Sequence, residues 1–179
     1  VFAPKDGNEL YDILYTSIRK KLFISIRYPK TFTDLDRKPN NIKIGTWEVL
    51  NKGVNICILA TGSMVEIAFN VIGKIKNLLN IDVSLINCRF IKPIDNIMLD
   101  SLVDNHQHFI TLEEGVLSGG FGSAISEYFS DNNIMKHLKL FGINDMFIQH
   151  GTRDELLKDL HLDEESITLY IKKIIENNE

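Results

Sequence analysis

The sequence has 179 residues, 44% of them hydrophobic and 25% charged, which is ordinary for a soluble globular protein able to bury a core. Its formal net charge of −4 gives no indication of the clustered Lys and Arg that bind a nucleic-acid backbone. No apolar run reaches the roughly 20 residues that a membrane helix requires. We therefore expect neither a nucleic-acid partner nor a membrane span.

The first thirty residues predict an incomplete α/β unit. Val1 to Pro4 is an apolar stub without an initiator Met, and it indicates the end of a strand belonging to something upstream. Asp6 and Glu9 have the spacing of a capping box, followed by apolar residues at helical spacing: Leu10, Ile13, Leu14 and Ile18. A β-rich run from Phe23 to Tyr28 stops at Pro29. The pattern predicts strand end, helix and strand, with the rest of the sheet absent.

Residues 31–41 are polar and aperiodic, which predicts a linker. Beyond it, strand and helix patterns alternate, which predicts a three-layer α/β/α sandwich around a mostly parallel sheet of about five strands. The predicted strands are 44–50, 55–61, 83–90, 109–112 and 137–140. The predicted helices are 63–79, with Ser63 as its cap, 95–105, 120–129, 153–160 and 164–177.

The tight turn Asn51-Lys52-Gly53 predicts that the first two of these strands pair antiparallel. Cys57 and Cys88 lie in separate apolar runs without a C-x-x-C pair, so we expect buried, reduced thiols. The five histidines show no metal-ligand spacing, and we expect them to be polar surface residues.

The most distinctive segment is T-L-E-E-G-V-L-S-G-G-F-G-S, residues 111–123, which passes from a strand end through glycines into a helix. Ligands of open α/β sheets gather beyond the carboxyl ends of strands, and a helix N-terminus attracts anions. One interpretation is a tight turn and close helix packing; the other is an interface or anion-binding turn. The residues concerned are Glu113, Glu114, Gly119, Gly120, Gly122 and Ser123. The adjacent Glu113 and Glu114 point to opposite faces of a strand, so they cannot act as one paired-carboxylate site.

Basic residues stand at the ends of two predicted strands. Arg27 and Lys30 lie where a substrate phosphate would sit beyond a strand end, although such charges are also common on surfaces. Arg89 interrupts an apolar stretch, which predicts an ion pair that fixes a loop or domain contact.

Six segments taken together resemble the 1-deoxy-D-xylulose-5-phosphate synthase family of the transketolase superfamily. They are A-P-K-D-G-N-E-L (3–10), I-R-Y-P-K (26–30), I-L-A-T-G-S-M-V (58–65), C-R-F-I-K-P-I-D (88–95), residues 111–123, and G-I-N-D-M-F-I-Q-H-G (142–151). The resemblance implies that residues 1–30 finish a pyrimidine-binding domain and that 42–179 form a transketolase C-terminal domain. It also implies a cytoplasmic homodimer that uses thiamine diphosphate and Mg²⁺ to condense pyruvate with D-glyceraldehyde 3-phosphate. The product of this reaction enters isoprenoid synthesis and also supplies thiamine synthesis.

The resemblance places the catalytic residues and the cofactor and metal ligands upstream of Val1, so we expect no catalytic, cofactor or metal residue in this chain and no turnover from it alone. One functional residue carries over: Lys30 matches the family's basic residue that holds the substrate phosphate. Lys replaces the usual Arg there, and Thr31 replaces the usual Gly.

Two alternatives stay open. In the first, the chain is the matching piece of a transketolase or of a 2-oxo-acid dehydrogenase β chain. In the second, it is a free-standing regulatory domain that binds a small anion at 119–123.

Overall fold

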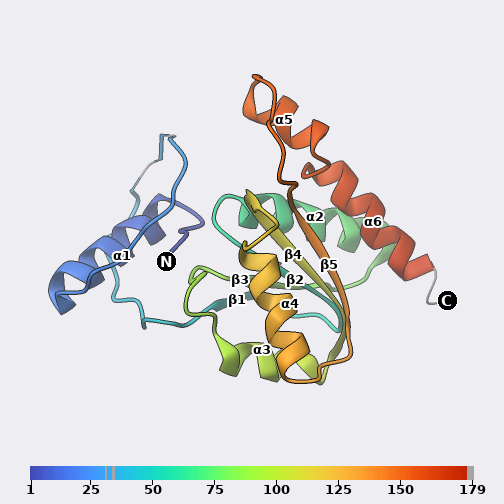
Figure 1. The fold of residues 1–179 in the computed structure, drawn as a ribbon, viewed down its shortest axis with the longest axis horizontal. Helices are drawn as coiled ribbons and strands as arrows, with labels where there is room; N and C mark the ends of the chain where they lie inside the picture. The colour runs from blue at the N-terminus through green and yellow to red at the C-terminus, as the bar shows by residue number, and fades with distance from the viewer. Residues whose placement is uncertain (31, 34, 177–179) are drawn as a thin grey trace.

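The structure is a computed structural model that describes residues 1–30, 32, 33 and 35–176. Helices and strands alternate through this part of the chain (Figure 1). The helices are α1 (Gly7–Lys20), α2 (Met64–Leu79), α3 (Asn96–Val103), α4 (Phe121–Asp131), α5 (Arg153–Asp159) and α6 (Glu164–Glu176). The strands are β1 (Glu48–Asn51), β2 (Asn55–Ala60), β3 (Ser84–Asn87), β4 (His106–Val116) and β5 (His137–Ile143).

The five strands form one sheet in the order β1-β3-β2-β4-β5. Strands β3, β2, β4 and β5 run parallel, and β1 is antiparallel at one edge. This confirms the predicted mostly parallel five-stranded sheet. Strand β4 runs from 106 to 116, well beyond the predicted 109–112, and it therefore carries Glu113 and Glu114 within the sheet.

The predicted pairing of the first two strands is wrong, because β1 pairs with β3. The turn at Asn51–Gly53 packs against residues 82–84: the Asn51 side chain donates to the Val83 carbonyl at 2.8 Å. The Gly53 amide donates to the Ser84 hydroxyl at 2.8 Å. The turn is thus held beside the start of β3, and β1 continues along β3 rather than folding back on β2.

Helices cover both faces of the sheet, as a three-layer sandwich requires (Figure 1). On one face β2, β3 and β4 pack against α2, α5 and α6 through the first apolar cluster. On the other face the same strands pack against α3, α4 and Ile13 of α1 through a second cluster that also holds Phe2 and Trp47. Cys57 and Cys88 are buried free thiols in this second layer, as expected.

Residues 1–30 form a helix between two extended segments. Phe2 bridges Ile26 in parallel and Phe90 antiparallel, so the predicted strand 23–28 is reduced to a single bridge. The Asp6 carboxylate caps α1 by accepting from the Glu9 amide at 2.7 Å. The second half of the predicted capping box differs, since the Glu9 carboxylate accepts from the Lys5 amide at 2.8 Å.

A buried polar network joins this first part of the chain to the sheet. Glu9, 2% exposed, accepts from Asn87 of β3 at 2.8 Å and pairs with Arg89 at 3.4 Å. Lys5 pairs with Glu48 of β1 at 2.9 Å. The predicted ion pair of Arg89 is confirmed, and it links α1 to the five-stranded sheet.

The second half of the polar segment is held against α1. Arg37 pairs with Asp12 of α1 at 2.7 Å, and the Ile42 amide donates to the Thr16 hydroxyl at 2.9 Å. Thr31 and the last position of the predicted helix 164–177 lie outside the described residues. None of the helices in the described part of the chain is long and apolar enough to cross a membrane.

Candidate functional site

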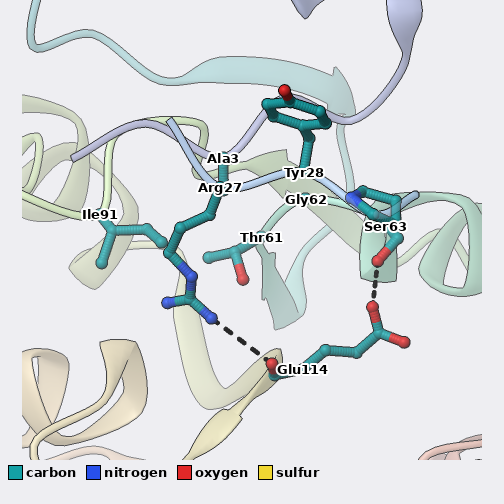
Figure 2. A pocket seen from close by; sticks show the side chains of 9 residues that line it. Ala3, Arg27, Tyr28, Thr61, Gly62, Ser63, Ile91 and Glu114 are labelled. Atoms are coloured by element: carbon teal, nitrogen blue, oxygen red, sulfur yellow. Dashed lines mark hydrogen bonds between the residues drawn. The ribbon is translucent and has the colours of Figure 1, made fainter. Parts of the chain in front are cut away.

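A pocket of about 220 Å³ lies where the carboxyl ends of β2 and β4 meet the segment 27–29. Figure 2 shows it from close by, with Arg27 and Ser63 approaching Glu114 from different sides. Gly62, with φ of 55°, turns the chain from β2 into α2 and brings it against Ala3. The pocket therefore occupies the edge of the sheet at which open α/β folds bind ligands.

Glu114 connects three separate elements at this pocket. Its carboxylate accepts a short hydrogen bond from the Ser63 hydroxyl at the start of α2. The same carboxylate pairs with Arg153 of α5 at 2.8 Å. Its main-chain carbonyl accepts from the Arg27 guanidinium at 3.4 Å (Figure 2). Ser63 stands at the N-cap position of α2 as predicted, but its side chain makes no capping hydrogen bond because the hydroxyl is directed to Glu114.

Glu113 points the other way and is 2% exposed. Its carboxylate accepts from the amides of Phe121 at 2.9 Å and Gly122 at 2.8 Å, the first turn of α4. A carboxylate at this position accepts hydrogen bonds from amides that would otherwise be unpaired, and it interacts favourably with the positive end of the helix dipole. Glu113 thus occupies the amides of Phe121 and Gly122, which the sequence analysis considered as a site for an anion.

The glycines of this turn make room for Glu113. A Cβ atom at Gly120 would lie 2.7 and 2.8 Å from the two Glu113 carboxylate oxygens and 2.3 Å from the Val116 carbonyl. Gly119, with φ of 71°, has a backbone conformation that L side chains rarely adopt. Gly119, Gly120 and Ser123 also border an open groove of about 760 Å³ between α4 and the Lys92–Pro93 loop. A role of this turn at an interface stays a prediction.

Lys30 lines a second pocket of about 420 Å³, which shares Tyr28, Pro29 and Ser63 with the first. Lys5 lies on its wall, but the Lys5 ammonium is drawn to Glu48 at 2.9 Å. Lys30 makes no ion pair with any residue that the structure describes. Two acidic residues, Asp6 and Glu66, line the same pocket.

The remaining candidates have structural roles. Burial raises the pKa of the Cys57 and Cys88 thiols, so both stay protonated. His106 is buried, with one ring nitrogen 2.7 Å from the Leu102 carbonyl and the other 2.9 Å from the Ser84 hydroxyl; for this residue the expectation of a surface position is wrong. Within the described ranges, no three His, Cys, Asp or Glu side chains converge as a metal site would require.

Sequence reasoning missed two residues that line the pocket, Thr61 and Ser63, and one residue outside its lining, Arg153. The Ser63 hydroxyl and Arg153 both bind Glu114. Arg153 starts α5, 39 residues after Glu114. Nothing in the spacing of the sequence indicates that the two meet, because the contact depends on how the chain returns after β5.

The fold and the pocket define an α/β sandwich domain with a pocket at the carboxyl ends of its parallel strands, where open α/β folds bind ligands. In sequence, residues 45–167 match the family described as "Transketolase, C-terminal domain", and the chain belongs to that family. Two solved structures share the fold. A split-gene transketolase in an inactive β4 tetramer has a TM-score of 0.81 at 24% identity, over 96% of this chain and 56% of that chain. Campylobacter jejuni transketolase has a TM-score of 0.62 at 12% identity, over 96% and 26%.

Curated relatives match the chain over nearly its whole length. 1-Deoxy-D-xylulose-5-phosphate synthase of Clostridium tetani is 43% identical over 176 residues, covering 98% of this chain. The enzyme of the same name from Aquifex aeolicus is 37% identical over 178 residues, again 98% of this chain. The chain spans 28% of the length of each, and it corresponds to their C-terminal portion.

Proposed function

We propose that this chain is the C-terminal portion of a 1-deoxy-D-xylulose-5-phosphate synthase, a cytoplasmic transferase. The enzyme condenses pyruvate with D-glyceraldehyde 3-phosphate and releases CO₂ in the first step of non-mevalonate isoprenoid synthesis. The observation that carries this proposal is the 43% identity to the Clostridium tetani enzyme over 98% of the chain. We assign residues 1–30 to the end of the pyrimidine-binding domain, 31–41 to a linker and 42–179 to the C-terminal domain. The same enzyme would also supply thiamine synthesis.

In this proposal the chain stabilises a homodimeric enzyme. The partners of the chain are the pyrophosphate- and pyrimidine-binding domains of that enzyme. Thiamine diphosphate, with Mg²⁺, supplies the carbanion chemistry when it is bound. The described residues do not fit either group: no acidic or histidine cluster converges, and Glu113 already holds the first amides of α4. We therefore assign the ligands of both groups to the part of the enzyme upstream of this chain.

Lys30 is the residue of this chain that we assign to the substrate. Lys30 lines the second pocket and has no ion pair among the described residues, whereas Lys5 on the same wall is paired with Glu48. A Lys offers a point charge to a phosphate dianion, without the two-pronged donor geometry of the family's Arg. Lys30 thus attracts and orients the phosphate of the aldehyde substrate and has no role toward pyruvate.

Steady-state kinetics of the intact enzyme test this assignment. Lys30→Ala is expected to raise KM for D-glyceraldehyde 3-phosphate about 10- to 100-fold, because one charge-assisted contact is lost. KM for pyruvate is expected to stay within about twofold. Lys30→Arg restores phosphate binding, and Lys43→Ala, at an exposed cation just after the polar segment, serves as the control. Equal losses toward both substrates contradict the role of Lys30.

The same enzyme distinguishes the alternatives. A transketolase would use a ketose donor in place of pyruvate, and a 2-oxo-acid dehydrogenase would pass the acyl group to an acceptor other than D-glyceraldehyde 3-phosphate. Product analysis separates these reactions. A free-standing domain that binds anions at 119–123 is the weaker candidate, because the amides of Phe121 and Gly122 are already paired with Glu113.

A further inference from the structure

The second pocket is lined by charges of both signs. Among the residues that the structure describes, the charged lining residues are Lys5 and Asp6 ahead of α1, Lys30 after the segment 27–29, and Glu66 in the first turn of α2. Their formal charges sum to zero, so the total charge of this lining does not explain how the pocket selects a ligand. The four residues differ in whether they already have a partner within the protein.

Two of these charges have partners of their own. The Lys5 ammonium pairs with Glu48 at 2.9 Å and with Glu9 at 3.5 Å. The Asp6 carboxylate accepts from the Glu9 amide at 2.7 Å and caps α1. Each of these charges is compensated by neighbouring groups of the opposite polarity, which weakens its interaction with a ligand in the pocket.

Lys30 and Glu66 are the two charges without such partners. Glu66 is exposed, and its carboxylate makes no hydrogen bond or ion pair with any residue in the described part of the chain. The two residues come from different elements that border the pocket, and they do not pair with each other. The described lining therefore presents one uncompensated cation and one uncompensated carboxylate to a ligand.

We propose that Glu66 is a specificity-determining residue of this pocket, which repels ligands that carry a second negative group besides a phosphate. The inference rests on the proposed function, in which Lys30 holds the phosphate of D-glyceraldehyde 3-phosphate. The rest of that substrate is uncharged. D-Glycerate 3-phosphate has the same carbon skeleton with a carboxylate in place of the aldehyde, and this second charge would meet Glu66. A repulsive group gives selectivity by weakening the binding of the wrong ligand.

Calorimetry with two unreactive phosphates tests this role in the intact enzyme. Glycerol 3-phosphate has an uncharged remainder and D-glycerate 3-phosphate has an anionic one. Thiamine diphosphate is kept bound, so that its own phosphate-binding site is filled. Glu66→Gln keeps the size of the side chain and removes its charge. We expect it to lower Kd for D-glycerate 3-phosphate about 3- to 10-fold, and Kd for glycerol 3-phosphate by no more than about twofold.

Glu127→Gln is the matched control, because Glu127 is also exposed and lies on α4, which packs on the other face of the sheet. It should leave both Kd values unchanged. Salt gives a second control: the ratio of the two Kd values in the wild type should approach one between about 0.05 and 0.5 M, because salt screens exposed charges. The favourable interaction of Glu66 with the dipole of α2 changes stability and not this ratio.

An unchanged ratio of the two Kd values in Glu66→Gln overturns the proposal. Equal weakening of both ligands also overturns it, because that result assigns Glu66 to the support of α2 alone. Lys30→Ala, measured alongside, separates this inference from the proposed function. If Lys30→Ala weakens both ligands while Glu66→Gln leaves the ratio unchanged, only the inference fails. If Lys30→Ala leaves the binding of glycerol 3-phosphate unchanged, the assignment of Lys30 fails and the inference fails with it.

Discussion

At the scale of single residues, two adjacent glutamates of β4 serve opposite sides of the sheet. Glu113 is buried and binds the first amides of α4, while Glu114 lies at the pocket with a side chain that is 29% exposed. Strand alternation predicts this division, since neighbouring side chains of a strand point to opposite faces. The partners were not predictable, because Arg153 and the α4 amides reach β4 only through the tertiary fold.

The difference in burial predicts very different costs for the same substitution. Glu113→Ala leaves the buried amides of Phe121 and Gly122 without an acceptor and should lower the free energy of unfolding by about 2 to 4 kcal/mol. Glu114→Ala removes a partly exposed pair and should cost about 1 kcal/mol or less. Urea denaturation of the two variants measures both values. Equal costs would contradict the assignment of Glu113 as the buried cap of α4.

At the scale of the elements, local patterns predicted the presence of the helices, but one pairing required the fold. Asp6 and the apolar spacing after it defined α1 correctly. The turn at 51–53 looked like a hairpin from its residues alone, yet its contacts with residues 82–84 send β1 along β3. A turn signal fixes only a change of direction, whereas the choice of neighbour depends on residues some thirty positions away.

The junction of α1 with the sheet contains two glutamates whose pKa values shift in opposite directions. Burial, opposed by the charges of Lys5 and Arg89, raises the pKa of Glu9. For Glu48, burial is outweighed by hydrogen bonds from Lys5 and Asn87, which lower its pKa. Folding therefore favours the protonated form of Glu9 and the ionised form of Glu48.

These signs predict different pH dependences for two matched substitutions. As pH rises from about 4.5 through the raised pKa of Glu9, ionisation of this buried carboxyl lowers the free energy of unfolding of the wild type. Glu9→Gln does not ionise, so its free energy of unfolding should rise relative to that of the wild type over the same pH range. The stability that ionised Glu48 contributes is complete above about pH 4.5 and is lost as pH falls below that value. The difference in free energy of unfolding between the wild type and Glu48→Gln should therefore stay constant over the same pH range. Chemical denaturation from pH 4.5 upward measures both differences. A difference for Glu9→Gln that stays constant with pH would show that burial does not dominate at this site.

At the scale of the whole molecule, the first part of the chain and the sheet share one apolar core. Phe2 is 1% exposed and contacts Phe90 edge-to-face, with ring centroids 4.8 Å apart. Ile13 of α1 belongs to the same cluster as Trp47 and the α4 residues. The family resemblance implied that residues 1–30 belong to a different domain from 42–179, and no local signal could show that the two would share a core. Their contact depends on long-range complementarity between side chains.

A shared core predicts that this chain unfolds as one unit. Phe2→Ala removes a buried aromatic side chain and should cost about 3 to 5 kcal/mol while leaving a single calorimetric transition at a lower Tm. Phe23→Ala makes the same chemical change at a fully exposed position and should leave Tm unchanged. If α1 and its strands were an independent lobe, Phe2→Ala would instead produce an early transition of its own, with the main transition at its wild-type temperature. Because Phe2 lies between Ile26 and Phe90, the loss is expected to reach the sheet directly.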